Sequence, residues 1–190
     1  MELLGTVEAG RPLLVVAVRL EADHLGTDLP VLITGMGKVN AALGLGATLG
    51  AGPRPSEVIN LGTAGGLRPG VSGTHVVGTV MQHDLDGDVL FKLTGEVTGP
   101  PLLVGDPAGP VLATGDAFIN DDAARDALAR DASLVDMEGY AVAAAAQQFG
   151  VPVRLVKHVS DDAGAGAAKS WRDSVADCSR LLGAWLAEHR

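Results

Sequence analysis

The sequence predicts an α/β fold, a three-layer sandwich in which helices flank a central, mainly parallel but mixed sheet. Short runs rich in Val, Leu and Ile alternate along the chain with Ala- and Leu-rich stretches of helical length. The strand-like runs are apolar nearly throughout, as expected of strands buried on both faces. With 47% hydrophobic and only 3% aromatic residues, the core must be built from Ala, Val and Leu.

The first half of the chain predicts four strands and one helix. The runs 13–18 (LLVVAV) and 30–35 (PVLITG) are β-branched and bounded by Pro, Gly or charge, which is typical of strands. The segment 38–51 (KVNAALGLGATLGA) has the length and the Ala and Leu content of a helix. The runs 57–62 and 75–80 are again apolar, and we expect two further buried strands there.

The second half of the chain begins with a loop and then continues the alternation. Residues 95–110 are rich in Gly and Pro and predict that loop. Apolar runs then predict strands, and stretches with helical length or a high Ala content predict helices between them. In order, we expect a strand at 111–115, a helix at about 122–130, a strand at 134–137, an Ala-rich helix over 141–146, a strand at 151–160 and a final helix at about 169–189.

Length, charge and cysteine content limit the setting. The length of 190 residues fits one domain, 1–190, with residues 1–12 as an N-terminal extension. The net charge of −9 argues against a nucleic-acid partner. The chain has no apolar run near the ~20 residues of a membrane span, no basic start of a signal peptide and only one cysteine, Cys178. We therefore expect a cytoplasmic protein with a small-molecule partner and without membrane or nucleic-acid partners.

Residues that follow the predicted strands are the candidates for a binding site. Ligands of such sheets bind in the crevice beyond the carboxyl ends of the strands. The six strand exits carry acids, flexible glycines or an aromatic ring, and they span 19–21, 35–37, 62–66, 115–118, 136–138 and 160–162. The glycines of the third exit are explained either by a tight turn or by the close approach of a ligand to Thr63 and the amides that follow it.

Two acids, Asp136 and Glu138, lie where the Ala-rich helix begins. The helix dipole alone explains an acid at this place. However, a helix that is apolar on all sides is usually buried, so a carboxylate at its start is well placed to face a cleft. Asp161 follows the longest predicted strand, where it either caps a turn or loses hydration. Lost hydration would raise its pKa and suit it to donate a proton.

Other motifs do not predict a cofactor or a metal ion. The segment 35–40 (GMGKVN) lacks the third glycine of a dinucleotide fingerprint. The side chains of 83–86 (HDLD) diverge on an extended segment, and hydrogen bonds that fix a loop are the better interpretation. No G-x-S-x-G elbow of a serine hydrolase is present. His158 lies within a strand and is interpreted as a satisfied core histidine.

Six motifs together resemble the nucleoside phosphorylase/nucleosidase family, with the greatest likeness to the 5'-methylthioadenosine/S-adenosylhomocysteine nucleosidases. They match that family in order and spacing over about residues 13–186. The motifs are AVRLEA (17–22), VLITGMGKVNAA (31–42), VINLGTAGGL (58–67), TGDAFIN (114–120), VDMEGYAVA (135–143) and VSDDA (159–163).

The resemblance implies a role for each matched residue. Three catalytic carboxyl groups follow from it: Asp161 protonates N7 of a purine, Glu138 accepts hydrogen bonds from the ribose hydroxyls, and Glu21 positions the attacking water. The other matched residues would contact the substrate. Met137 would pack on the sugar, Phe118 would stack on the base, Ile119 would pair with the base edge through its backbone, Ser160 would support Asp161, and Thr63, Ala64 and Gly65 would line the opposite wall. Asp136 has a supporting role.

The resemblance implies an enzyme that needs no cofactor, usually a homodimer, and it leaves the reaction partly open. The phosphorylases of the family carry an Arg where this chain has Asn60, which favours water over phosphate. Arg19, two residues before Glu21, is the cation that could still bind phosphate. The alternatives are therefore a purine nucleosidase, a hydrolase of another purine nucleoside such as futalosine, a phosphorylase and a non-catalytic nucleoside-binding protein. The chain between 83–86 and 114–118 is shorter than in typical members, so the 5' substituent stays open.

Overall fold

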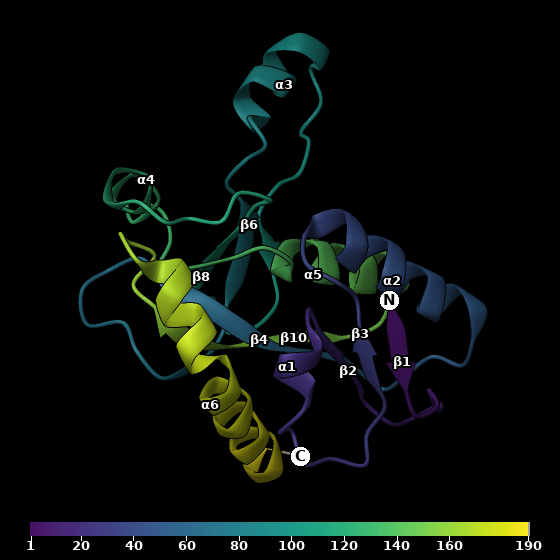
Figure 1. Cartoon of the computed structure of the whole chain (residues 1–190). Coiled ribbons are helices and arrows are strands. Elements are labelled where there is room, and N and C mark those ends of the chain that lie inside the picture. The colour runs from purple at the N-terminus through teal and green to yellow at the C-terminus, as the bar shows by residue number, and fades with distance from the viewer. Residues whose placement is uncertain (190) are drawn as a thin grey trace.

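The computed structural model describes residues 1–189 and contains a ten-stranded mixed sheet (Figure 1). The strands are β1 (Glu2–Leu4), β2 (Leu13–Val16), β3 (Val31–Ile33), β4 (Val58–Gly66), β5 (Thr74–Val76), β6 (Thr79–Gln82), β7 (Leu102–Leu103), β8 (Val111–Thr114), β9 (Leu134–Asp136) and β10 (Val153–Asp161). Their order is β1-β3-β2-β4-β9-β8-β6-β7, and β10 pairs with both β4 and β5. The last residue of the expected domain 1–190 lies outside the described residues.

The sheet is mainly parallel, with antiparallel pairs at its edges and between the central strands β4 and β9. Strand β2 is parallel to β3 and β4, β4 is parallel to β10, and β8 is parallel to β6 and β9. The pairs β1–β3, β5–β10, β6–β7 and β4–β9 are antiparallel. The predicted fold class, a mainly parallel mixed sheet between helices, is confirmed. The parallel strands bring their carboxyl ends to one edge, where the site lies.

Helices cover both faces of the sheet, as Figure 1 shows. The helices are α1 (Arg19–Ala22), α2 (Lys38–Ala51), α3 (Gly87–Thr94), α4 (Asp122–Leu128), α5 (Gly139–Gln148) and α6 (Ala167–Glu188). Leu45 of α2 and Ala143 of α5 pack with Leu155 of β10 in one buried cluster. Leu182 of α6 and Val156 of β10 belong to a second cluster on the other face. The Ala-rich α5 is buried along most of its length, as its composition predicted.

Some elements differ from the sequence-based expectation. The expected strand 75–80 is divided into β5 and β6, because β5 pairs with β10 whereas β6 pairs with β7 and β8, so the chain changes partners between Val76 and Thr79. Residues 1–12, expected as an extension, supply β1 at the sheet edge, and the expected loop 95–110 contains the two-residue β7. Helix α3 was not expected. In Figure 1 it projects away from the rest of the molecule, and none of its residues is buried.

None of the helices described over residues 1–189 is long and apolar enough to span a membrane.

Candidate active site

One pocket lies at the carboxyl ends of β2, β4, β9 and β10. Its empty volume is about 550 Å³, with the open solvent at its mouth included. All ten residues that the sequence predicted for the site line it: Glu21, Thr63, Ala64, Gly65, Phe118, Ile119, Met137, Glu138, Ser160 and Asp161. Nine of the ten belong to the six predicted strand exits, and Ile119, which the family resemblance added, follows the exit 115–118 directly.

Glu21 lies in α1 and is held by four hydrogen bonds. Its Oε2 accepts from the amides of Ala17 (3.0 Å) and Val18 (3.3 Å). Its Oε1 accepts from the amide (2.9 Å) and the hydroxyl (3.1 Å) of Thr63. Ser179 of α6 donates to the backbone oxygen of Glu21 at 2.7 Å. The carboxylate is therefore buried but fully hydrogen-bonded, which keeps its orientation fixed.

Glu138 is the residue from which α5 starts, and it is also buried. Its Oε1 accepts a hydrogen bond from the amide of Gly37 at 2.8 Å, at the start of α2. Burial, and then the charge of Asp136, raise the pKa of Glu138 from 4.5 to about 8, although Lys157 and the Gly37 amide act in the opposite direction. A ligand that donates hydrogen bonds to Glu138 stabilises the charged form of its carboxyl group and lowers this pKa.

Asp136 forms the base of the site with a lysine that the sequence analysis did not select. Its Oδ2 lies 2.8 Å from Nζ of Lys157, and both side chains are 1% exposed. The Asp136 carboxylate also accepts from Gly139 N and from the Thr114 hydroxyl, at 2.9 and 2.6 Å. Burial lowers the pKa of Lys157, but Asp136 and Glu138 outweigh that effect and raise it. Lys157 is thus a buried cation among carboxylates.

Asp161 ends β10 and is half-buried at the pocket wall. Its Oδ2 accepts from the Ser160 hydroxyl at 2.8 Å, and its Oδ1 accepts from Ala163 N at 2.9 Å. Burial raises the pKa of Asp161 above its ordinary value, although these two donors lower it. Ala163 has φ 52°, the left-handed region that a non-glycine residue adopts at a cost. This turn aims the Ala163 amide at Asp161.

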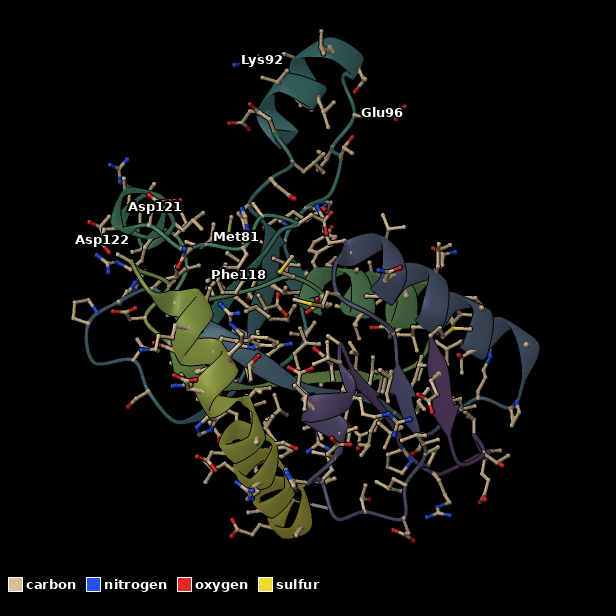
Figure 2. All side chains as sticks on the ribbon, viewed as in Figure 1. Met81, Lys92, Glu96, Phe118, Asp121 and Asp122 are labelled. Carbon is tan, nitrogen blue, oxygen red and sulfur yellow. The ribbon has the colours of Figure 1, made fainter. Side chains whose placement is uncertain are left out.

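Phe118 and Ile119 form the apolar wall of the pocket. Phe118 is 42% exposed. Figure 2 shows it on the segment between β8 and α4, on the side from which α3 projects. A polar network fixes the base of this segment, because Asp84 accepts from Asp116 N (2.9 Å) and pairs with Lys38 (2.5 Å). The expectation that 83–86 fixes a loop agrees with these hydrogen bonds. The part of the chain described here holds no cluster of side chains able to bind a metal ion.

The sequence analysis missed Lys157, directly behind the pocket, and Trp171, at its wall. Lys157 lies in a strand that also carries Arg154 and His158, so nothing in the sequence of the strand marked it as a buried cation. Trp171 of α6 lines the pocket, as does Met36 from the predicted strand exit 35–37. Trp171 donates through its indole Nε1 to the Thr63 hydroxyl at 2.9 Å. No local pattern indicated it, since α6 as a whole packs on the outside of the sheet.

Positive charge is missing from the pocket wall. Among residues 1–189, no Lys, Arg or His lines it. Arg19 is half-exposed and pairs with Glu2 of β1 instead. The Asn60 side chain is buried and donates to the Val15 oxygen at 3.0 Å, so it does not reach the pocket. Three carboxyl groups in different environments and an apolar wall can therefore bind a neutral, partly aromatic molecule and exchange protons with it.

Comparisons with known proteins place these residues in a family context. The model of the phosphorylase superfamily matches residues 10–187. A 5'-methylthioadenosine/S-adenosylhomocysteine nucleosidase from Marinomonas sp. (strain MWYL1) is 33% identical over 173 residues, covering 78% of this chain and 74% of the relative. The nucleosidase of the same name from Bacillus subtilis (strain 168) is 32% identical over 166 residues, covering 75% and 71%.

Solved structures share the fold at lower identity. A mutant of the Helicobacter pylori 5'-methylthioadenosine/S-adenosylhomocysteine nucleosidase with 5'-methylthioadenosine in its active site superposes with a TM-score of 0.82 at 20% identity, covering 95% of this chain and 98% of the other. A futalosine hydrolase mutant from the same species gives a TM-score of 0.81 at 20% identity, covering 94% and 97%.

Proposed function

The chain belongs to the phosphorylase superfamily, and from this membership we propose that it is a purine nucleosidase. The enzyme hydrolyses the N-glycosidic bond of a 5'-methylthioadenosine- or S-adenosylhomocysteine-like nucleoside and releases a free purine and a ribose derivative. One observation carries the proposal: Glu21, Glu138 and Asp161 line one pocket whose described lining has no cation to hold phosphate. Relatives named as nucleosidases of such substrates support it.

The proposed reaction assigns a different task to each carboxyl group. Asp161, whose pKa burial raises, donates its proton to N7 of the purine as the C–N bond breaks, so that the base leaves as a neutral molecule. Glu138 carries negative charge next to the sugar, where positive charge develops in the transition state. Glu21, held by four hydrogen bonds, orients a water molecule and takes its proton while the water oxygen bonds to C1'.

The remaining lining residues bind the substrate in this proposal. Met137 packs against the ribose, Phe118 stacks on the purine and Ile119 pairs with the base edge through its backbone. Ser160, which donates to Asp161 at 2.8 Å, supports the acid. Thr63, Ala64 and Gly65 form the opposite wall, where a Cβ at Gly65 would lie 3.2 Å from Asp161 Oδ1.

Release of free base from a panel of nucleosides tests the proposal. The panel contains 5'-methylthioadenosine, S-adenosylhomocysteine, adenosine, inosine, futalosine and uridine, each with and without phosphate. We expect release of a purine without phosphate, and the ranking of the panel identifies the 5' substituent and the base. Release that requires phosphate would make the protein a phosphorylase and require Arg19 to leave Glu2. No release from any compound would favour a nucleoside-binding protein without catalysis.

Substitution of Asp161 by Asn tests the assignment of the general acid. The variant keeps the shape of the side chain but has no proton to donate to N7. We expect kcat to fall by about a hundredfold to ten-thousandfold, while calorimetry still detects nucleoside binding. Asp162→Asn is the matched control, because the Asp162 carboxylate is on the exposed neighbouring residue and accepts from Gly164 N. An Asp161→Asn variant at the wild-type rate would refute the mechanism.

We also propose a homodimer, a cytoplasmic location, a role in purine salvage and a single functional domain over 1–190. The dimer is supported by apolar side chains that the single chain leaves exposed on two helices: Val39 and Leu43 of α2, and Val89, Phe91 and Leu93 of α3. Apolar surface of this kind usually marks an interface. Cell fractionation tests the location.

A further inference from the structure

A tryptophan at the pocket wall connects to Glu21 through a single hydroxyl group. Trp171 is the only described residue of α6 that lines the pocket. Its indole Nε1 donates to Thr63 Oγ1 at 2.9 Å, and Thr63 Oγ1 in turn lies 3.1 Å from Glu21 Oε1. Residues from α6, β4 and α1 thus form one chain of hydrogen bonds that ends at the carboxylate proposed to activate water.

The chemistry of the three groups fixes the direction of this chain. An indole N–H only donates, so the Thr63 oxygen is the acceptor. A carboxylate only accepts, so the hydrogen of the Thr63 hydroxyl points to Glu21. Groups arranged in this way polarise one another and strengthen each bond.

Thr63 also supplies the one donor to Glu21 that can turn. The other three donors are the backbone amides of Ala17, Val18 and Thr63, which the fold holds in place. A carboxylate has about four acceptor positions, and all four are used. Water therefore gains access to Glu21 when the hydroxyl hydrogen of Thr63 turns away from it.

We propose that Trp171 is a positioning residue for the attacking water, an inference that rests on the proposed nucleosidase function. The indole N–H holds the oxygen of Thr63 in place, so that only the hydroxyl hydrogen turns, from Glu21 to the oxygen of the incoming water. The water donates one hydrogen to the vacated position on Glu21. As its oxygen bonds to C1' of the sugar, that proton moves to Glu21, while Thr63 and Trp171 undergo no covalent change.

Kinetics of four variants test the proposal. Trp171→Phe keeps an aromatic ring but removes the donor, and Thr63→Val keeps the shape of Thr63 but removes the hydroxyl. We expect each to lower kcat about fivefold to tenfold, the scale of one lost hydrogen bond, with KM changed less than about twofold. The double variant should be no slower than the slower single variant, and Thr63→Ser should keep most of the rate.

The control is Trp185→Phe, because Trp185 lies in the same helix but stacks on His189 at 4.4 Å, outside the pocket. It should leave kcat and KM unchanged. An unchanged kcat in Trp171→Phe, a loss confined to KM, or additive losses in the double variant would each overturn the proposal.

A second readout does not depend on turnover. In ¹⁵N-labelled Trp185→Phe protein, the remaining indole N–H signal belongs to Trp171. We expect Thr63→Val to shift this signal and to speed its exchange with solvent, and we expect Thr63→Ser to do neither. If Thr63→Val changes neither the position of the Trp171 signal nor its exchange rate, the proposal is overturned even if the enzyme is active. Wild-type protein that releases no base would instead refute the proposed function.

Discussion

Glu138 has the most strongly altered proton affinity among the residues that line the pocket, and this has a measurable consequence. Its pKa of about 8 in the free protein leaves it mostly protonated at pH 7. Ribose hydroxyls that donate to the carboxylate favour its charged form and lower the pKa. The bound state then holds fewer protons than the free state between the two pKa values, so binding at pH 7 should release up to ~one proton per site.

Calorimetry of a non-hydrolysed nucleoside analogue in buffers of different ionisation enthalpy measures this release. Glu138→Gln provides the control, since its amide does not titrate, and its binding enthalpy should be independent of the buffer. Proton uptake by the wild type, or an equal release by Glu138→Gln, would contradict the assignment of the altered pKa to Glu138.

Individual residues could be selected from the sequence where a motif marked them. All ten candidates line one pocket, because they lie in the last residues of β4 and β10 or in the segments that follow β2, β8 and β9. Lys157 was missed for a physical reason. A lysine side chain is ordinarily exposed to water, because burying its charge costs desolvation free energy. The carboxylate of Asp136, 2.8 Å away in the folded structure, offsets that cost for Lys157. No local pattern contains that information.

At the scale of elements, the packing of α6 against α1 controls where Glu21 lies. A Cβ at Gly183 would lie 2.7 Å from the backbone oxygen of His24 and 2.9 Å from that of Leu25. We therefore expect Gly183→Ala to push α6 away from the end of α1, to lower the free energy of unfolding by about 1–3 kcal/mol, and to lower kcat through the displaced Glu21. Chemical denaturation and steady-state kinetics measure the two effects.

Gly46→Ala is the matched control for this packing. Gly46 is also inside a helix, α2, but the nearest atom to a Cβ there, in the Phe149 ring, is 4.0 Å away. The same substitution should stabilise the protein by about 0.5–1 kcal/mol. A Gly183→Ala variant that is as stable and active as Gly46→Ala would show that this contact between α1 and α6 can relax without cost.

Elements were predicted best where local pattern and tertiary context agree. Helix α2 spans Lys38–Ala51, the predicted range. Strand β4 continues to Gly66 instead of ending at 62, because pairing with β10 and β9 keeps a glycine-rich segment extended. Helix α3 was not predicted, and its apolar side chains Val89, Phe91 and Leu93 stay exposed in the single chain, so contacts with the core do not account for this helix.

At the scale of the whole molecule, the proposed dimer predicts the effect of a charge on α3. Leu93 is 76% exposed and lies near the end of the projecting helix, where Figure 2 labels the neighbouring Lys92. A charge buried without a partner is costly, so Leu93→Asp should weaken dimerisation by about tenfold or more. Sedimentation velocity over a range of concentrations measures the change.

Leu181→Asp is the comparison, because Leu181 is 49% exposed but lies on α6, which Figure 1 shows apart from α2 and α3. It should leave the dimer intact. A monomeric wild type, or equal weakening by the two aspartates, would contradict the proposed interface.

The pairing of β4 with β10 has a consequence for how the protein is made. These adjacent strands carry Thr63 and Asp161 and pair in parallel, with one register shift between Val159 and Asp161, although residues 67–152 lie between them along the chain. Such non-local pairing forms late in folding, because closing a long loop costs conformational entropy before the contacts between the strands can offset it. A growing chain on the ribosome therefore cannot form the nucleoside site until β10 and α6 have been synthesised. Nucleoside binding during translation would report the moment at which the sheet closes.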